Sequence, residues 1–184
     1  NYFDNDGNFN ADGREFFEQR AQGGFGLLYT GAMTALTSDD QIGQNTPAPL
    51  KNPRTFIPSA RRLTDQVHLY GSKIFGEITF GHGRVLGEPA PSATPVLGHP
   101  DRQSKAMTTE QIEAKVQAIA QTAKVLQKAG FDGIDVHGLH WGYVLEQFAA
   151  ELTNHRQDQY GGTLANRLRP CQEAVTAIKE ACGQ

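Results

Sequence analysis

The chain has 184 residues, which is enough for one domain with a sizeable hydrophobic core. Its hydrophobic content of 38% and charged content of 20% are typical of a soluble globular protein. The formal net charge of -3 gives no electrostatic reason to expect nucleic acid or an anionic membrane as a partner. No apolar run approaches the ~20 residues that a membrane-spanning helix needs.

The elements predicted from hydrophobic periodicity alternate between helices and strands. The strands are short and nearly continuous in apolar residues, and glycines follow the helices. In the first part of the chain we predict, in order, a helix over 14–22, a strand over 25–33 (FGLLYTGAM), a polar loop over 37–56, a helix over 58–69 and a strand over 73–80 (KIFGEITF). Pro58 takes a tolerated position in the first turn of the second helix.

The second part of the chain begins with a Gly/Pro-rich segment over 81–100, which is too long to be a simple connector. Thr108 and Thr109 are expected to cap a strong helix whose apolar positions line roughly one face. A third strand, DGIDVHG, and a last long helix over 164–181 complete the order.

The order of the elements predicts an α/β fold. Buried strands separated by helices favour a parallel sheet. No G-x-G-x-x-G follows a strand, so the dinucleotide fingerprint of a doubly wound sheet is missing. Long or polar loops follow the strands, whereas connections at the opposite end, such as KAGFDG and YGSK, are short. This asymmetry is typical of a (β/α)8 TIM barrel, and we expect residues 1–184 to form about the first half of one such domain, truncated at both ends.

The two cysteines, Cys171 and Cys182, fall in one predicted helix, about three turns apart and out of disulfide reach. Two unpaired thiols favour a reducing, cytoplasmic setting. No Cys-x-x-Cys pair is present that would indicate a zinc or iron–sulfur site. The chain shows no signal peptide at its start, but it also lacks an initiator Met, so a lost leader stays open.

Polar and aromatic side chains gather where the third strand ends, in GFDGIDVHGLHWGYVLEQF. His137 and His140 lie three positions apart, and Tyr143 follows them. A His-x-x-His pair by itself is more often structural, or part of a metal site that lacks its third ligand. A position at the rim of a barrel favours catalysis instead. Asp135 lies on the same strand face as His137, and a buried carboxylate there needs a partner.

Three segments in this order, FFEQRAQGGFGLLYTGAMTA, KIFGEITFGHGR and GFDGIDVHGLHWGYVLEQFAAELTNHRQDQYGGTLANRLRP, cover nearly the whole chain. Together they resemble the Old Yellow Enzyme family of flavin-dependent reductases, in the branch of 2,4-dienoyl-CoA and enoate reductases. The third segment is the most specific. That family is an eight-stranded (β/α) barrel that binds FMN at the carboxyl ends of its strands. The resemblance implies that the chain carries strands 2 to 4 with their flanking helices, with one strand before Asn1 and four after Gln184.

The resemblance implies an FMN-dependent ene-reductase that oxidises NADH or NADPH. Hydride from flavin N5 would reduce the C=C bond of an α,β-unsaturated carbonyl or acyl thioester. His137 and His140 are implied as donors to the carbonyl oxygen, on which negative charge grows, since an imidazole nitrogen can donate whether the ring is neutral or charged. Tyr143 is implied as the general acid that protonates the α-carbon. Trp141 shifts Tyr143 by one position from the commoner family spacing, as in a branch that includes bile-acid-modifying oxidoreductases.

Four positions are implied as cofactor-binding. Gly31 and Ala32 fall where the family places small residues against the flavin ring, although helix packing is an alternative for them. Glu77 stands in place of a family glutamine at the flavin pyrimidine edge, where an ionised carboxylate can only accept a hydrogen bond. Its negative charge predicts a lowered flavin potential. Arg84 matches an arginine at the end of the family's motif, and His82 is expected to be a solvent-facing loop residue.

The segment NHRQDQYGGTLANR is expected to be architectural, holding a tight turn and capping the helix that follows. Two alternatives to the ene-reductase remain open. One is an amine-dehydrogenase-type flavin oxidoreductase on the same scaffold, and the other is an inactive half-barrel that self-associates through its open edges. A small-molecule enone or enoyl substrate is expected, and a homo-oligomer stays open. Any [4Fe-4S] cluster or FAD, and the FMN phosphate site, would lie beyond Gln184.

Overall fold

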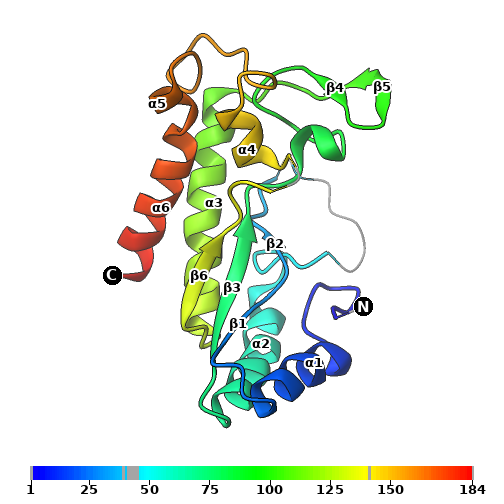
Figure 1. Cartoon of the computed structure of the whole chain (residues 1–184), viewed down its shortest axis with the longest axis vertical. Helices are drawn as coiled ribbons and strands as arrows, with labels where there is room; N and C mark the ends of the chain where they lie inside the picture. Colours follow the sequence, from blue (N-terminus) through cyan, green and yellow to red (C-terminus); the bar gives the residue numbers. More distant parts are fainter. Residues whose placement is uncertain (1, 39, 41–45, 141, 184) are drawn as a thin grey trace.

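The computed structural model describes residues 2–38, 40, 46–140 and 142–183 of the chain (Figure 1). Its helices are α1 (Ala11–Gln22), α2 (Pro53–His68), α3 (Thr109–Lys128), α4 (Val144–Ala149), α5 (Leu164–Arg167) and α6 (Arg169–Cys182), with a short 3-10 helix, η1 (Gly83–Val85). Its strands are β1 (Leu27–Tyr29), β2 (Met33–Thr34), β3 (Lys73–Thr79), β4 (Pro95–Val96), β5 (His99–Gln103) and β6 (Gly133–Val136). Within these ranges, no helix is long and apolar enough to cross a membrane.

A parallel sheet with β3 in its middle organises the fold. β1 and β2 both pair with one edge of β3, and β6 pairs with the other edge. Figure 1 shows these strands running in one direction, with α3 packed alongside them and α6 beside α3. The expected parallel sheet is confirmed, and its strands neighbour one another in chain order, as consecutive strands of a (β/α) barrel do.

The expected strand FGLLYTGAM is interrupted in its middle, so the prediction of one continuous strand is wrong. Thr30 donates its N–H to the carbonyl of Phe75 at 3.1 Å. Its side-chain Oγ1 then accepts from the N–H of Glu77 at 3.0 Å, a place that a backbone carbonyl would fill in a regular ladder. The side-chain bond ends β1, and the ladder resumes at β2.

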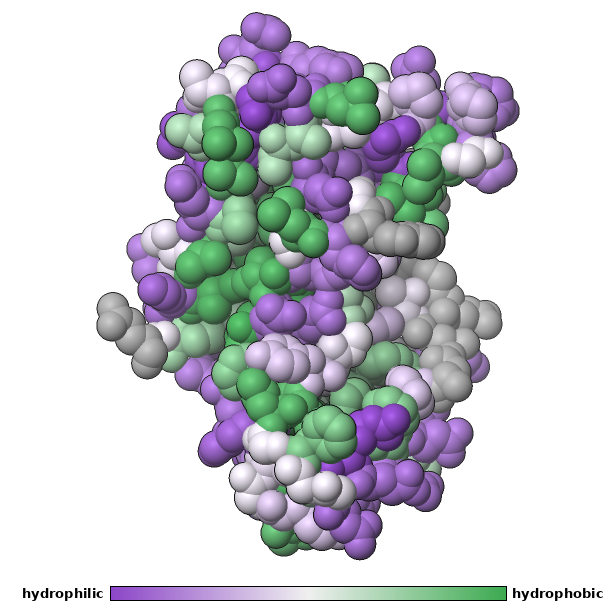
Figure 2. Space-filling view, in the orientation of Figure 1, coloured by the Kyte–Doolittle hydropathy of each residue, from purple (hydrophilic) through white to green (hydrophobic). Residues whose placement is uncertain are grey.

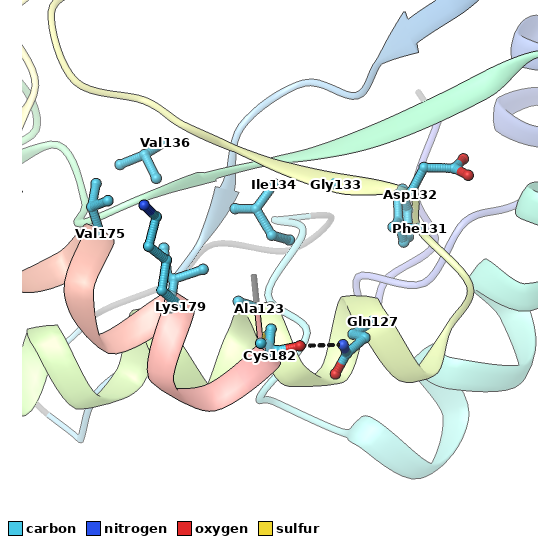
Figure 3. A pocket seen from close by; sticks show the side chains of 12 residues that line it. Ala123, Gln127, Phe131, Asp132, Gly133, Ile134, Val136, Val175, Lys179 and Cys182 are labelled. Carbon is cyan, nitrogen blue, oxygen red and sulfur yellow. Dashed lines mark hydrogen bonds between the residues drawn. The ribbon is translucent and has the colours of Figure 1, made fainter.

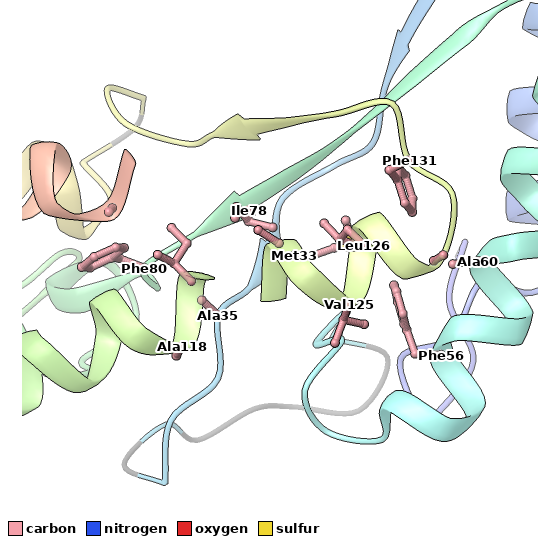
Figure 4. Close-up of a cluster of buried hydrophobic side chains, with 14 of the residues drawn as sticks. Met33, Ala35, Phe56, Ala60, Ile78, Phe80, Ala118, Val125, Leu126 and Phe131 are labelled. Atoms are coloured by element: carbon pink, nitrogen blue, oxygen red, sulfur yellow. The ribbon is translucent and has the colours of Figure 1, made fainter. Parts of the chain in front are cut away.

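The hydrophobic core lies on the helical face of the sheet. Ile74 and Ile78 of β3 are fully buried there, together with Phe56 of α2. Between the two isoleucines, Gly76 allows α3 to approach closely, because a Cβ at this position would lie 2.6 Å from a methyl carbon of Leu126. Figure 4 shows the side chains of β3, α2 and α3 meeting in this cluster. Because the helices cover this face, the opposite face of the sheet is the one that remains for other contacts.

Helix α2 begins at Pro53, earlier than predicted, so Pro58 lies inside the helix and not in its first turn. The helical periodicity could not distinguish a start at Pro53 from a start at Pro58, because proline favours the first turn of a helix in either case. In the structure it is Pro53 that takes this first-turn position. Pro58 has no N–H to donate to the carbonyl of Arg54. Both residues are exposed, so water can satisfy that carbonyl.

Other helix boundaries also differ from expectation, and α1 begins at Ala11 and not at Arg14, with Asn10 as its cap. Thr108 caps α3 as predicted, through a capping box with Gln111, but Thr109 is the first helical residue and not a cap. The expected last long helix is divided at Leu168 into α5 and α6. Pro170 explains the division, since it cannot donate the backbone hydrogen bond that would continue the first helix.

Helix α4 and the antiparallel hairpin of β4 and β5 were not predicted. Strand β5 has the sequence HPDRQ and is exposed along its whole length. It therefore lacks the alternation of apolar and polar residues by which a strand is recognised. Helix α4 spans only six residues, too few to show a helical period.

Asp132 ties the amino ends of β3 and β6 together. Its carboxylate accepts from the backbone N–H of Ile74 at 2.9 Å and from Nζ of Lys73 at 2.8 Å, and it lies 2.7 Å from Nε2 of His68. Burial alone would raise the pKa of this carboxyl, but the bonds to Lys73, Ile74 and His68 lower the pKa from 3.8 to about 2. The ionised form is therefore the one that the fold stabilises.

We expect the Asp132 contacts to stabilise the fold at neutral pH and to lose that effect in acid. A carboxyl with a lowered folded-state pKa stabilises the fold above its unfolded pKa, and this stabilisation disappears as the pH falls through the folded pKa. Asp132→Asn should therefore lower the free energy of unfolding by about 2 kcal/mol at pH 7 and by little near about pH 2. Urea unfolding at both pH values measures this, with Asp101→Asn on the exposed β5 as the control. An equal loss at both pH values would contradict the prediction.

Candidate active site

The carboxyl ends of β3 and β6 bring two of the expected residues into contact. Glu77 is the register partner of Asp135, so the side chains of both residues lie on one face of the sheet. The N–H of His137 donates to the carbonyl of Ile78 at 2.8 Å, which continues the pairing past the end of β6. His137 thereby points to the same face as Asp135, and its Nδ1 atom is hydrogen-bonded to Oε1 of Glu77.

The three expected catalytic side chains lie together. The ring centroid of His137 is 4.5 Å from that of Tyr143 and 5.2 Å from that of His140. The rings of His140 and Tyr143 are 6.5 Å apart. Trp141, which shifts Tyr143 in the sequence, lies outside the described residues. The local fold thus gathers two imidazoles and a phenol at the carboxyl end of β6.

One nitrogen of His137 has no partner. The side chain is 9% exposed, and its Nε2 atom is buried without a hydrogen bond within the described residues. Because Glu77 occupies Nδ1, Nε2 is the atom that remains for another group. Buried polar atoms in proteins are normally hydrogen-bonded, so an orphaned ring nitrogen marks a place where a ligand atom can supply the partner.

His82 was expected to be a solvent-facing loop residue, and this is wrong. Its ring centroid lies 4.7 Å from that of Tyr143, and only 22% of its side chain is exposed. Its backbone N–H donates to Glu88 at 2.9 Å, while its Nδ1 atom is 3.6 Å from the same carboxylate. Burial alone would raise the pKa of Glu88, but the side chain and backbone of His82 lower the pKa below its usual value. A single loop histidine has no periodicity that could have predicted this contact.

Gln147 of α4 was also missed, although it joins the two loops of the site. It is 2% exposed, and its Nε2 donates to the carbonyl of Gly142 at 2.5 Å and to that of His82 at 2.9 Å. Its Oε1 accepts from the N–H of Arg84 at 3.2 Å. One amide side chain therefore holds the segment just before Tyr143 against the segment after β3. Any glutamine on a buried helix face could do this, so its sequence position carried no signal.

The expected cofactor-binding residues differ in the protein contacts that surround them. Gly31 and Ala32 lie between β1 and β2, and a Cβ on Gly31 would meet no protein atom within 4 Å. No protein neighbour therefore requires a glycine there. Arg84 lies in η1, and its Nε donates to the carbonyl of Pro95 in the hairpin at 2.9 Å. Within the described residues its side chain makes no hydrogen bond to Glu77.

The segment NHRQDQYGGTLANR holds a tight turn and caps the helix that follows, as expected. Asn154 is buried and donates to the carbonyls of Phe148 and Tyr160, both at 2.8 Å. Asp158 accepts from the N–H of Tyr160 at 3.0 Å and so closes the turn. Thr163, a residue of this segment, caps helix α5. The segment thus anchors the end of α4, which carries Gln147, to the helices that follow.

A cavity of about 400 Å³ opens at the free edge of β6, but it is not part of this site. Figure 3 shows it between β6 and α6, with Ile134, Val136 and Val175 among its lining. Figure 2 shows hydrophobic side chains gathered in the same region. Ile134 and Val136 alternate with His137, so the cavity lies on the helical face of the sheet. No expected site residue lines it.

Comparison with known proteins connects this geometry to flavin enzymes. The profile of the NADH:flavin oxidoreductase / NADH oxidase family matches residues 2–184. Cinnamate reductase of Clostridium sporogenes is 42% identical over 187 aligned positions, which cover 97% of this chain and 28% of that protein. Old Yellow Enzyme from Pichia sp. superposes with a TM-score of 0.84 at 30% identity, over 99% of this chain and 50% of that structure.

Histamine dehydrogenase from Rhizobium sp. is similar at a TM-score of 0.81 and 27% identity, over 99% of this chain and 28% of that structure. The chain thus spans between about a quarter and a half of the length of the proteins it matches. The likeness to Old Yellow Enzyme confirms the expected fold class, a partial (β/α)8 barrel.

Proposed function

Because the chain belongs to the NADH:flavin oxidoreductase / NADH oxidase family, we propose that it is part of an FMN-dependent ene-reductase. The reaction oxidises NADH or NADPH and reduces the C=C bond of an α,β-unsaturated carbonyl or acyl thioester. The observation that carries the proposal is the grouping of His137, His140 and Tyr143, with an orphaned buried nitrogen among them.

The side chains of His137 and His140 hold the carbonyl oxygen of the substrate in this proposal. Negative charge develops on that oxygen during reduction, and fixed donors aimed at it stabilise the transition state. Tyr143, whose ring lies against His137, supplies the proton to the α-carbon as general acid. Gln147 positions Tyr143 through the carbonyl of Gly142.

Four residues are proposed to contact FMN, which supplies hydride at N5 when bound. Two observations support the fit. Gly31, next to Ala32, faces no protein atom that a Cβ would meet, and the second carboxylate oxygen of Glu77 makes no hydrogen bond within the described residues. That oxygen can accept from the flavin N3–H, and its charge is proposed to lower the flavin potential. Arg84 keeps guanidinium nitrogens beyond the one that donates to Pro95.

An amine-dehydrogenase-type reaction is the second candidate, because histamine dehydrogenase shares the scaffold. The higher identity to cinnamate reductase, 42% against 27%, supports the reductase. We further propose that residues 1–184 are part of one FMN-binding (β/α) barrel domain, truncated at both ends, and that this domain acts on a small molecule. Cys171 and Cys182 are free thiols, which supports a reducing, cytoplasmic setting.

The visible spectrum of the full-length protein, saturated with FMN and then desalted, tests this function. We expect a yellow protein that NADH or NADPH bleaches under anaerobic conditions, and whose colour returns when cyclohexenone is added. The same protein without a nicotinamide is the control and should keep its colour. A colourless protein after desalting would reject the proposal. A flavin bleached by an amine and not by a nicotinamide would favour the second candidate.

A further inference from the structure

Glu77 and His137 form a contact that decides which nitrogen of the imidazole carries the proton. We propose that Glu77 is a positioning residue whose carboxylate keeps the proton of His137 on Nδ1. Nε2 then offers a lone pair in the neutral ring, and it becomes a donor only when the ring takes up a second proton. For its link to substrate, the inference rests on the proposed function. For the position of the proton, it rests on the geometry alone.

The first step is the direction of the hydrogen bond. Nδ1 of His137 is bonded to Oε1 of Glu77, and an ionised carboxylate can only accept. The ordinary pKa of a glutamic acid lies about two units below that of an imidazolium, so the shared proton stays on the ring. Oγ1 of Thr30 accepts a hydrogen bond from the backbone N–H of Glu77 at 3.0 Å. This bond fixes the position of the Glu77 backbone from which the carboxylate extends. Nδ1 is therefore the donor.

A second carboxylate lies on the same face of the sheet as the pair. Asp135 is the register partner of Glu77, so the side chains of Glu77, Asp135 and His137 lie on the same face of the sheet. In the described part of the chain, no Lys or Arg side chain is hydrogen-bonded to Glu77 or Asp135.

The remaining titratable groups come from the loops. His140 and Tyr143 contact the ring of His137 at centroid distances of 5.2 and 4.5 Å. His82 reaches the cluster only through Tyr143. None of these rings is hydrogen-bonded to Nε2 of His137, which is buried without a partner in the described residues. Among the described residues, no group therefore competes with a ligand atom for Nε2.

His137 and His140, both expected to be donors, therefore differ. Donation from Nε2 of His137 to a carbonyl oxygen requires the doubly protonated ring, with Glu77 as its counter-ion. A glutamine at position 77 could instead donate its amide N–H to Nδ1, which would leave the proton on Nε2 of a neutral ring. Glu77 thus makes the hydrogen bond from His137 to a ligand depend on the uptake of one proton.

Nitrogen NMR of the full chain labelled with ¹⁵N-histidine tests the position of the proton without flavin or substrate. At a pH where His137 is neutral, we expect its proton on Nδ1 in the unmodified protein and a shift toward Nε2 in Glu77→Gln. Asp135→Asn removes the same charge without the hydrogen bond and should leave the proton on Nδ1. The signal is assigned by its loss in His137→Gln. A proton on Nε2 in the unmodified protein, or no change in Glu77→Gln, would overturn the inference.

Kinetics of the full-length, flavin-loaded protein give a second readout. Uptake of one proton on binding predicts that KM for cyclohexenone rises up to about tenfold per pH unit at high pH. This slope should flatten in Glu77→Gln and persist in Asp135→Asn. An equal slope in Glu77→Gln would count against the role of Glu77. Absence of turnover in all variants would reject the proposed function, and the NMR result would still decide where the proton lies.

Discussion

Replacing His137 or His140 by alanine is expected to lower kcat for enone reduction by the full-length, flavin-loaded protein about 10²–10³-fold. Each imidazole is proposed to donate to an oxygen that gains negative charge, and loss of one such donor costs about 2.7–4 kcal/mol of transition-state stabilisation. The effects should not add, because the rings lie 5.2 Å apart and act on one oxygen. Steady-state turnover of cyclohexenone measures the loss.

His99→Ala is the matched control, because His99 lies on the exposed strand β5 and should tolerate the change. Flavin absorbance of each variant verifies that the cofactor site has formed. Wild-type kcat in either site variant, with flavin bound, would show that the rings serve a structural purpose. The ene-reductase proposal would then lose its main support.

Asp40→Ala is expected to lower the free energy of unfolding by about 3 kcal/mol. Lys115 of α3 is 4% exposed, and its Nζ atom lies 2.5 and 2.6 Å from the two carboxylate oxygens of Asp40. The alanine would leave this ammonium group buried without its main counter-ion, and breaking a buried pair from one side costs about 3–5 kcal/mol. Glu88 also attracts Lys115, which places the loss at the lower end of that range.

The double variant Asp40→Ala/Lys115→Met separates the cost of an orphaned charge from the value of the pair. Replacing both partners by apolar groups is often close to neutral, so the double variant should recover most of the lost stability. Lys51→Met, at an exposed position, controls for the loss of a lysine. Denaturant unfolding of the unmodified protein and of these three variants measures the free energies of unfolding. A double variant as unstable as Asp40→Ala would show that the carboxylate matters for other reasons, such as its bonds to Thr37.

The regular elements could be predicted because their signals are local. The apolar run KIFGEITF corresponds to β3 almost residue for residue, and Thr108 with Gln111 marks the start of α3. Elements without a local signal were missed, as α4 and the polar hairpin show. The prediction of a single helix over 164–181 failed because the hydrophobic periodicity continues across Leu168. The backbone hydrogen bonds do not continue there, because Pro170 has no N–H to donate.

The sequence by itself determined the alternation of the main strands and helices, the position of His137 and His140 after the third predicted strand, and the family resemblance that the comparisons confirm. Only the tertiary structure decided that Nδ1 of His137 is bonded to a carboxylate 60 residues away and that His82 lies against Tyr143. The physical reason is that such contacts depend on strand register and loop packing. Both bring together residues that share no local pattern in the chain.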